Sequence, residues 1–212
     1  ALGAPRDYLL GLQYIDSSGS MVTTGGKVVK NVAGYDMTRL MTGSAGTLGF
    51  ITEASWRVAT RPEACRVTSA AGSLANCSAA ALAVINSNLL PVFVTAVPED
   101  GSWKLMVGFE GISEVVDHQI ERCAEKMTEN GLSSNDKADY PVIEGPFKSV
   151  FEEIWNAPYV CQADVVIANV KQMCEDAARI AEPSRIMVDF ACGRMYAGYE
   201  TLSDNQWAEL GT

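Results

Sequence analysis

The pattern of apolar and polar positions predicts a β-rich opening stretch. Two β-type runs, Tyr8–Ile15 and Met21–Thr24, flank the turn residues 16–19 (Asp-Ser-Ser-Gly), which is the pattern of a hairpin. Asp36 can accept the first amide hydrogen bonds of a short helix over 37–41, which ends at Gly43. This stretch therefore predicts a small sheet accompanied by one short helix.

A longer strand is predicted over 48–58. Its even positions are mostly apolar and share one face of an alternating strand, with Thr52 as the exception. Its odd positions are mostly small or polar, so Ile51 is predicted on an otherwise polar face with Gly49, Glu53, Ser55 and Arg57. Pro62 follows this strand, and a proline at a strand end stops pairing, so we expect two domains, 1–62 and 63–212.

The order predicted after Pro62 is strand, helix, strand, strand, helix. The strands are expected at 66–70, 92–97 and 103–109, and Ser73 caps the first helix, which extends to Ile85. The second helix ends at Gly131 and carries an apolar stripe of Val116, Ile120, Cys123, Ala124 and Met127. This order makes up most of a ferredoxin-like unit, which requires a closing strand near 136–142.

The remainder of the chain repeats the theme more loosely. A helix near 147–154, a strand near 164–168, a helix over 170–181 and a strand over 186–190 are predicted. The predicted fold class is therefore α+β, in two parts.

Composition and charge restrict the class of protein. The chain has 212 residues, 48% of them apolar, and a net charge of −10, so neither a disordered chain nor a nucleic-acid binder is expected. No apolar run approaches the ~20 residues that cross a bilayer, and no leader sequence opens the chain. The first residue is Ala1 rather than Met, so a processed or truncated product is expected.

The six cysteines predict no metal site. None forms a CxxC pair, and none lies near the single histidine, His118. An even number would suit disulfides in a short secreted chain, but we interpret these cysteines as reduced and packed as small hydrophobic side chains. The expected compartment is the cytoplasm.

The sharpest local motif is the glycine pattern at 43, 46 and 49, just before the long strand. Without a Cβ, such a segment lets a backbone or a flat ligand approach closely, and its N–H groups can donate to an anionic or carbonyl acceptor. The alternative is a plain turn before a strand. The motif is not a Walker loop, because no Gly-Lys-Ser/Thr follows it, and it is not a Rossmann fingerprint, because the glycines precede a strand.

Three motifs together resemble one family. They are GAPRDYLLGLQYID (Gly3–Asp16), KVVKNVAGYDMTRLMTGS (Lys27–Ser44) and GTLGFITEASWRV (Gly46–Val58). In this order they resemble the FAD-linked oxidases of the vanillyl-alcohol oxidase/PCMH superfamily, and most closely the FAD-binding subunits of bacterial glycolate oxidases. The motifs span about a quarter of the chain. The downstream residues fit the family's substrate-side cap domain in layout.

The resemblance implies a flavin site. In the family, the main chain of the segment that matches 45–51 contacts FAD, which assigns cofactor binding here to Ala45, Gly46, Thr47, Leu48, Gly49, Phe50 and Ile51. Many relatives carry Glu where this chain has Ala45, a change that backbone contacts tolerate. Arg6-Asp7 and Lys30-Asn31 match motif positions expected to orient loops.

The resemblance also implies a missing part. The family's glycine-rich pyrophosphate loop belongs to an N-terminal subdomain that matches nothing in this sequence. Residues 1–62 are thus expected to be the C-terminal part of a PCMH-type FAD-binding domain, and 63–212 the α+β cap. On this interpretation the fragment does not retain FAD, is inactive alone, and exposes an apolar surface that favours self-association.

The implied function is oxidation of a 2-hydroxy acid such as glycolate by FAD. Electrons would leave through partner subunits, including an iron–sulfur subunit, and those partners could hold the protein against the inner membrane. A non-catalytic assembly subunit of a flavin oxidase complex is the alternative. A free-standing ferredoxin-like binding module has only its generic fold in support.

No catalytic residue is assigned from the sequence. His118 lies on a polar helix face, and Glu152-Glu153 is a surface pair. Arg194 and Tyr196 have the chemistry to bind a substrate carboxylate, but an ordinary strand end is the favoured interpretation of that segment.

Overall fold

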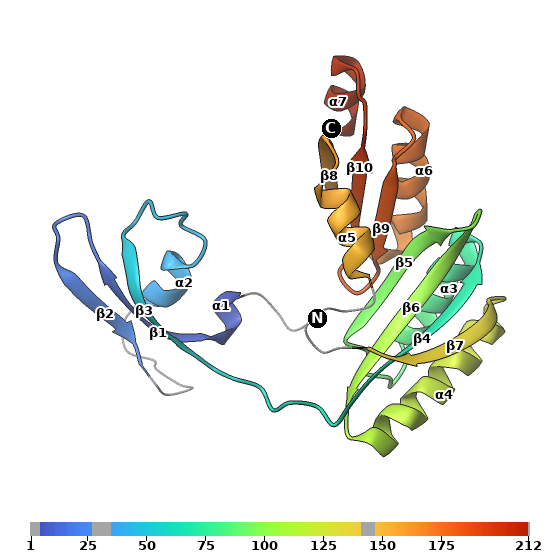
Figure 1. Cartoon of the computed structure of the whole chain (residues 1–212), viewed down its shortest axis with the longest axis horizontal. Helices are drawn as coiled ribbons and strands as arrows, with labels where there is room; N and C mark the ends of the chain where they lie inside the picture. The colour runs from blue at the N-terminus through green and yellow to red at the C-terminus, as the bar shows by residue number, and fades with distance from the viewer. Residues whose placement is uncertain (1–4, 27–34, 141–146, 212) are drawn as a thin grey trace. The chain divides into compact units, whose positions relative to one another are not determined.

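The computed structural model describes residues 5–26, 35–140 and 147–211. The chain divides between Arg61 and Pro62 into two compact units. Both units are α+β with antiparallel sheets (Figure 1), as the sequence predicts.

The first unit is a three-stranded sheet with one helix. Its strands are β1 (Leu9–Ile15), β2 (Met21–Gly25) and β3 (Phe50–Trp56), in the order β2-β1-β3. The predicted hairpin is confirmed, because β1 pairs antiparallel with β2 around the Asp16 turn. A short helix, α1 (Pro5–Tyr8), precedes β1.

The predicted cap of the short helix is also confirmed. Asp36 accepts a hydrogen bond from the Arg39 amide at the start of α2 (Met37–Met41), as a helix N-cap does. The helix places Met41, 2% exposed, against Leu12 and Tyr14 of β1. These three side chains are the buried core of the unit, so the core is small.

A β-bulge corrects the predicted faces of the long strand. Ala54 lies opposite Leu12, but Ile51 lies opposite Tyr14, so Thr52 is an extra residue in the ladder. The bulge puts Ile51 on the same face as Ala54 and moves Phe50 to the other face. The predicted strict alternation over 48–58 is therefore wrong at these two positions.

The second unit is a seven-stranded antiparallel sheet. The order is β7-β4-β6-β5-β9-β10-β8. Its strands are β4 (Ala64–Gly72), β5 (Phe93–Glu99), β6 (Ser102–Gly111), β7 (Ser133–Asp139), β8 (Tyr159–Asp164), β9 (Arg185–Asp189) and β10 (Arg194–Tyr199). Its helices are α3 (Leu74–Ile85), α4 (Ser113–Glu129), α5 (Lys148–Trp155), α6 (Val170–Ile180) and α7 (Asp204–Leu210), with a 3-10 turn, η1 (Ile167–Asn169).

The first half of this unit has ferredoxin-like topology. Along the chain it runs β4-α3-β5-β6-α4-β7, and β7 closes the sheet beside β4, as the sequence predicts. Ser73 caps α3 by accepting from the Asn76 amide. Gly131 follows α4 with a φ of 76°, the left-handed conformation that ends many helices.

The two faces of the sheet are covered differently (Figure 1). Helices α3, α4 and α6 pack on one face, around fully buried side chains such as Phe109, Phe190 and Tyr199. Helix α5 packs on the other face through Ile154, against β9 and β10. The larger core thus lies under three helices.

One predicted strand is misplaced. Residues 164–168 were expected to form a strand, whereas β8 ends at Asp164 and Ile167 begins a 3-10 turn. The apolar run Val165-Val166-Ile167 resembles a strand, but the Val165 amide donates to the Gly193 carbonyl, the chain turns, and Val166 is 67% exposed. Strand β10 and helix α7 were not predicted.

Within the described residues the cysteines form no disulfide, and four of them are buried: Cys65, Cys77, Cys123 and Cys174. Burial raises the pKa of Cys77 to about 11, which keeps the thiol neutral. Cys192 departs from the expected packing because it is exposed. Of the helices in the described part of the chain, none has the length and apolar character to cross a membrane.

Candidate functional site

The predicted site residues 45–51 form the connection between α2 and β3. The turn begins where the Ser44 amide donates to the Met41 carbonyl, at 3.2 Å, and continues where the Thr47 amide donates to the Ser44 carbonyl, at 2.9 Å. Every residue from Ala45 to Ile51 is exposed except Gly49, which is half-buried. The fold thus presents the segment as a continuous outer edge.

The backbone of this edge has free donors. Within the described part of the chain, the N–H groups of Ala45, Gly46 and Leu48 have no acceptor. Ala45 and Gly46 both have positive φ values, 49° and 78°. A non-glycine residue in this conformation is uncommon and costs free energy, and such residues cluster at functional sites. The arrangement offers N–H groups to an acceptor outside the described residues.

Two glycines of the motif have different reasons to be glycine. A Cβ at Gly49 would lie 2.7 Å from the backbone oxygen of Ile15 and 3.0 Å from the Tyr14 ring, so packing against β1 excludes a side chain there. A Cβ at Gly46 would meet nothing within 4 Å. Packing therefore explains Gly49, whereas at Gly46 only the positive φ of 78°, and no contact in the described structure, favours glycine.

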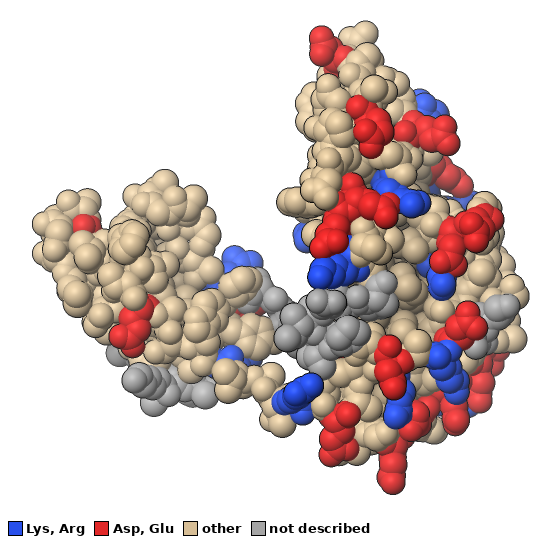
Figure 2. Space-filling model, in the orientation of Figure 1, with Lys and Arg blue, Asp and Glu red and all other residues tan. Residues whose placement is uncertain are grey.

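The side chains of the segment are apolar and exposed. Phe50 is 72% exposed, and Leu48 and Ile51 are exposed by more than two-fifths. Other large apolar side chains of the same unit are also exposed, namely Met21, Tyr35, Leu40, Trp56 and Val58. Figure 2 shows few charged side chains on the visible face of this unit. Because Phe50 and Ile51 lie on opposite faces of β3, both faces of the strand carry an exposed apolar side chain at this end.

Described residues of the first unit line one small hollow, which does not include the 45–51 segment. This hollow of about 110 Å³ lies over Gly11, Gln13, Thr23, Glu53 and Ser55. Pockets that enclose organic ligands are usually ~300–1,000 Å³. The 45–51 edge is therefore an open surface that offers backbone donors and exposed apolar side chains.

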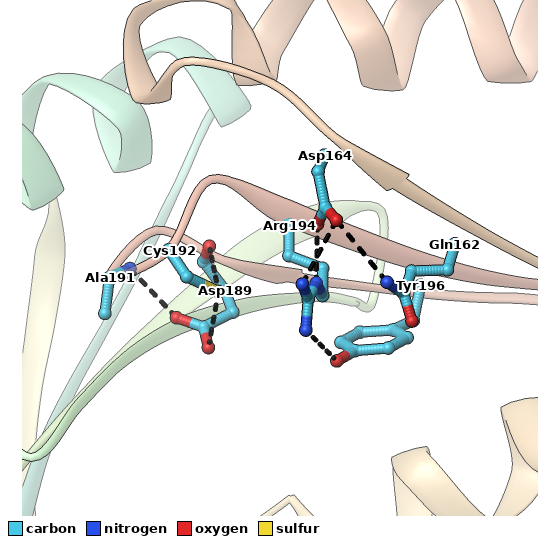
Figure 3. Close-up of polar contacts among 7 residues, drawn as sticks. All are labelled: Gln162, Asp164, Asp189, Ala191, Cys192, Arg194 and Tyr196. Carbon is cyan, nitrogen blue, oxygen red and sulfur yellow. Dashed lines mark hydrogen bonds and ion pairs between the residues drawn. The ribbon is translucent and has the colours of Figure 1, made fainter. Parts of the chain in front are cut away.

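Figure 3 shows Arg194 and Tyr196, and Tyr196 packs edge-on against Phe151 of α5. Arg194 of β10 is directly opposite Asp164 of β8, and its guanidinium holds both carboxylate oxygens of that residue. A third nitrogen, Nη1, donates to the Tyr196 hydroxyl at 3.4 Å. The guanidinium lowers the pKa of Asp164 through these hydrogen bonds. Arg194 is thus paired within the fold, which agrees with the interpretation of this segment as an ordinary strand end.

Cys192 lies in the β9–β10 turn beside Asp189 (Figure 3). Its thiol donates to Oδ2 of Asp189 at 3.3 Å, while Oδ1 of the same carboxylate accepts from the Ala191 amide. Desolvation first, and the Asp189 charge second, raise the pKa of Cys192 to about 11. The exposed thiol is therefore not an activated nucleophile.

The remaining candidates agree with their predicted surface roles. His118 is exposed on α4, and Glu152 and Glu153 are exposed on α5, where Glu153 pairs with Arg185. Lys30-Asn31 lies outside the described residues. Arg6 and Asp7 are exposed in α1. Sequence reasoning missed the Asp164–Arg194 pair, because only the strand register brings these residues together.

Sequence comparisons find similarity to glycolate oxidase subunits and related proteins. It is 29% identical over 186 residues to glycolate oxidase subunit GlcD of Bacillus subtilis, a match that covers 86% of this chain and 36% of that protein. It is 52% identical over 62 residues to glycolate oxidase subunit GlcE of Escherichia coli, covering 29% of this chain and 18% of that protein. The chain thus spans only about a third or less of these relatives. No family model matches it.

Structure comparisons cover nearly the whole chain. An alkyldihydroxyacetonephosphate synthase structure superposes with a TM-score of 0.67 at 18% identity, covering 99% of this chain and 48% of that one. A p-cresol methylhydroxylase structure with substrate bound gives 0.65 at 13% identity, covering 96% and 55%. The chain therefore has the fold of the PCMH-type FAD-linked oxidases, and the resemblance predicted from its three motifs is confirmed.

Proposed function

We propose that residues 45–51 form one wall of an FAD site in an oxidoreductase that acts on 2-hydroxy acids. The observation that carries this proposal is the set of free N–H groups at Ala45, Gly46 and Leu48, on an exposed segment where packing does not account for Gly46. Such donors suit the carbonyl and ring-nitrogen acceptors of a flavin, and the absent Cβ lets a flat ring approach.

The names of the relatives support the substrate class. Besides the glycolate oxidase subunits, the chain is 43% identical over 61 residues to a D-lactate dehydrogenase of Arabidopsis thaliana. It is 40% identical over 60 residues to a D-2-hydroxyglutarate dehydrogenase of Xanthomonas citri. Glycolate, lactate and 2-hydroxyglutarate are all 2-hydroxy acids. Among them we propose glycolate, because one glycolate oxidase subunit matches over 186 residues and another is 52% identical over 62 residues.

In this proposal the protein binds, orients and shields the cofactor. When bound, FAD supplies the redox chemistry by accepting a hydride from the hydroxy-bearing carbon of the substrate. The N–H groups of Ala45, Gly46 and Leu48 would donate to polar acceptors of the cofactor. An exposed apolar side chain of the segment would exclude water from its surroundings. We assign the second unit to the substrate-side cap domain.

We propose further that the chain is part of a larger flavoprotein. The exposed apolar side chains of the first unit, Phe50 and Val58 among them, suit a surface that another subdomain covers. That subdomain would supply the pyrophosphate grip. The proposed complex is cytoplasmic, contains other glycolate-oxidase-type subunits including an iron–sulfur subunit, and reaches the inner membrane through them.

The full-length protein provides the direct test. Purified anaerobically, it should show a flavin absorbance spectrum that bleaches when glycolate or another 2-hydroxy acid is added. A full-length protein purified without flavin would contradict the proposal. A flavin that bleaches only with substrates of another class would keep the cofactor assignment and overturn the substrate class.

A non-catalytic assembly subunit is the second candidate. Two observations favour it: His118 is exposed on α4, and the Arg194 guanidinium is already held by Asp164. In a reconstituted complex, Gly46→Leu would then leave turnover and FAD stoichiometry unchanged. Loss of both would support the catalytic assignment.

A further inference from the structure

The outer strand β8 has an unpaired edge. Among the described residues it pairs only with β10, and it ends the seven-stranded sheet. The Val165 amide donates to the Gly193 carbonyl, and these residues continue the β8–β10 register. Antiparallel ladders alternate between bonded and non-bonded pairs, so Val160, Gln162 and Asp164 point their N–H and C=O groups away from β10. The edge is a ready template for another strand.

The two edges of the sheet differ in how they resist pairing. Strand β7, at the opposite edge, carries Asp136, Lys137 and Asp139, and charged side chains are a common protection for sheet edges. Strand β8 has one charge, Asp164, which Arg194 neutralises within the same molecule. Strand β8 thus lacks the protection that β7 has.

The β8 edge is complementary to itself. Exposed apolar side chains lie at both ends: Tyr159, which packs against Trp207 with ring centroids 5.7 Å apart, and Val166, 67% exposed. If two copies pair antiparallel with Gln162 opposite Gln162, Val160 pairs with Asp164 of the other copy. The outward N–H and C=O groups of Val160, Gln162 and Asp164 then all bond to the second copy. Both copies use the same surface, as a two-fold symmetric interface requires.

The same register places the apolar ends against each other. Tyr159 of one copy lies opposite Val165 of the second copy, and Pro158 lies opposite Val166. The Asp164 carboxylates do not face each other, because each stands beside a Val160 and remains paired with its own Arg194. A shift of the register by two residues leaves part of each edge unpaired.

We infer that two copies of this chain associate through antiparallel pairing of their β8 strands, which makes one continuous sheet. The occupant of the edge is a second copy because hydrogen bonds, apolar ends and local charge all match under one two-fold axis. The net charge of −10 opposes this association at long range, so added salt should tighten it by screening. The inference is independent of the flavin assignment.

Sedimentation of the purified chain with two variants tests the inference. Val166→Glu places a carboxylate against the apolar end of the second copy and should weaken dimerisation about tenfold or more. Val115→Glu is the matched control, because Val115 is also exposed, at 52%, but lies on α4. It should leave the dimer unchanged. A monomeric parent chain, or equal effects of both variants, would overturn the inference.

Amide hydrogen exchange in β8 provides a second measurement, which association through the first unit would not affect. The amides of Val160, Gln162 and Asp164 should be protected at high protein concentration and should exchange freely on dilution. In Val166→Glu they should exchange freely at the same concentration. Fast exchange of these amides at every concentration would overturn the inference even if the chain were dimeric.

Discussion

At the scale of single residues, substitutions at Gly49 and Gly46 distinguish a glycine required by packing from a glycine on an open surface. Gly49→Ala would bring a Cβ to 2.7 Å from the Ile15 oxygen, so we expect a loss of about 2 kcal/mol in the stability of the first unit. Gly46→Ala meets no neighbour and bears only the strain of its φ, about 1 kcal/mol. Urea dependence of hydrogen exchange in β1 measures both.

Gly101 provides a matched control for Gly46. Its φ is also 78°, and a Cβ there also meets nothing within 4 Å. Gly101→Ala should therefore destabilise the hairpin between β5 and β6 by about the same 1 kcal/mol. Equal losses for Gly46→Ala and Gly49→Ala would show that the close approach of β1 is not what fixes Gly49.

The thiol of Cys192 offers a second residue-scale prediction. Its pKa is raised to about 11, so the thiolate is scarce at pH 8 and alkylation should be slow, increasing as the pH rises toward 11. Asp189→Asn removes a negative neighbour, which lowers the pKa, while the amide oxygen can still accept from Ala191. We expect labelling by iodoacetamide at pH 8 to accelerate about tenfold.

Mass spectrometry of the labelled chain measures this rate at Cys192 alone. The four buried cysteines serve as internal references, because Asp189→Asn should not change their labelling. An unchanged rate at Cys192 would mean that desolvation alone holds its pKa up.

Residue identity could be predicted better than residue partners. The surface positions of His118 and Glu152 follow from helix periodicity alone, and the sequence indicates both correctly. The pairing of Arg194 with Asp164 depends on the register between β10 and β8. No local sequence pattern encodes that register. The sequence alone therefore could not exclude that Arg194 binds a substrate, whereas in the fold Arg194 pairs with Asp164.

At the scale of elements, α2 holds the start of the proposed flavin wall. Asp36 accepts from the Arg39 amide at 3.2 Å and from the Thr38 hydroxyl at 2.6 Å. Asp36→Ala removes both bonds and should destabilise the helix by about 1 kcal/mol. The protection factors of the Leu40 and Thr42 amides, which bond back to residues 36 and 38, report this loss.

The same cap should depend on pH. The Thr38 hydroxyl, followed by the Arg39 amide, lowers the pKa of Asp36 in the folded state. A lowered pKa stabilises the fold above the unfolded-state value of ~3.9, and this stabilisation is lost as the pH falls through the folded-state value. Protection of α2 should therefore be constant from pH 7 to ~5 and decline below ~4. Asp36→Asn, which does not titrate, should abolish the decline.

Local pattern predicts most elements but fails where tertiary contacts override it. The caps at Asp36 and Ser73 and the closing strand of the ferredoxin-like unit have signals in the sequence. The bulge at Thr52 does not, because a single threonine in an apolar position is equally consistent with an uninterrupted strand. The run after Asp164 is β-type in composition, yet Val165 makes the last in-register bond, to the Gly193 carbonyl, and a 3-10 turn begins at Ile167.

At the scale of the whole molecule, the proposed site is half of a cofactor site. The 45–51 edge offers N–H donors, but the described residues form no glycine-rich phosphate loop, and the net charge of −10 repels an anionic ligand. Each missing charge-assisted hydrogen bond costs ~1.5–3 kcal/mol of affinity. We therefore expect the 212-residue chain to purify colourless and to show no saturable FAD binding at micromolar concentration.

Calorimetric titration of the chain with FAD measures this. A one-to-one isotherm in the low micromolar range would show that the half-site suffices. Bovine albumin under the same conditions controls for heats of dilution and non-specific binding.

More of the overall architecture than of the site chemistry could be predicted from the sequence. Turn residues and hydrophobic periodicity predict the α+β class, the hairpin and the ferredoxin-like order. The three motifs carry the family resemblance. The free N–H groups of Ala45 and Gly46 became visible only in three dimensions, because a sequence does not show which turn amides find acceptors.

The central claim, that the 45–51 segment contacts the flavin, is tested most directly by the flavin content of the full-length protein with Gly46→Leu or Gly101→Leu. Both substitutions put the same side chain at the same φ into open space. The account predicts that Gly46→Leu weakens FAD binding about tenfold or more, which corresponds to at least ~1.4 kcal/mol, whereas Gly101→Leu keeps the parent flavin-to-protein ratio. Full flavin content in Gly46→Leu would contradict it.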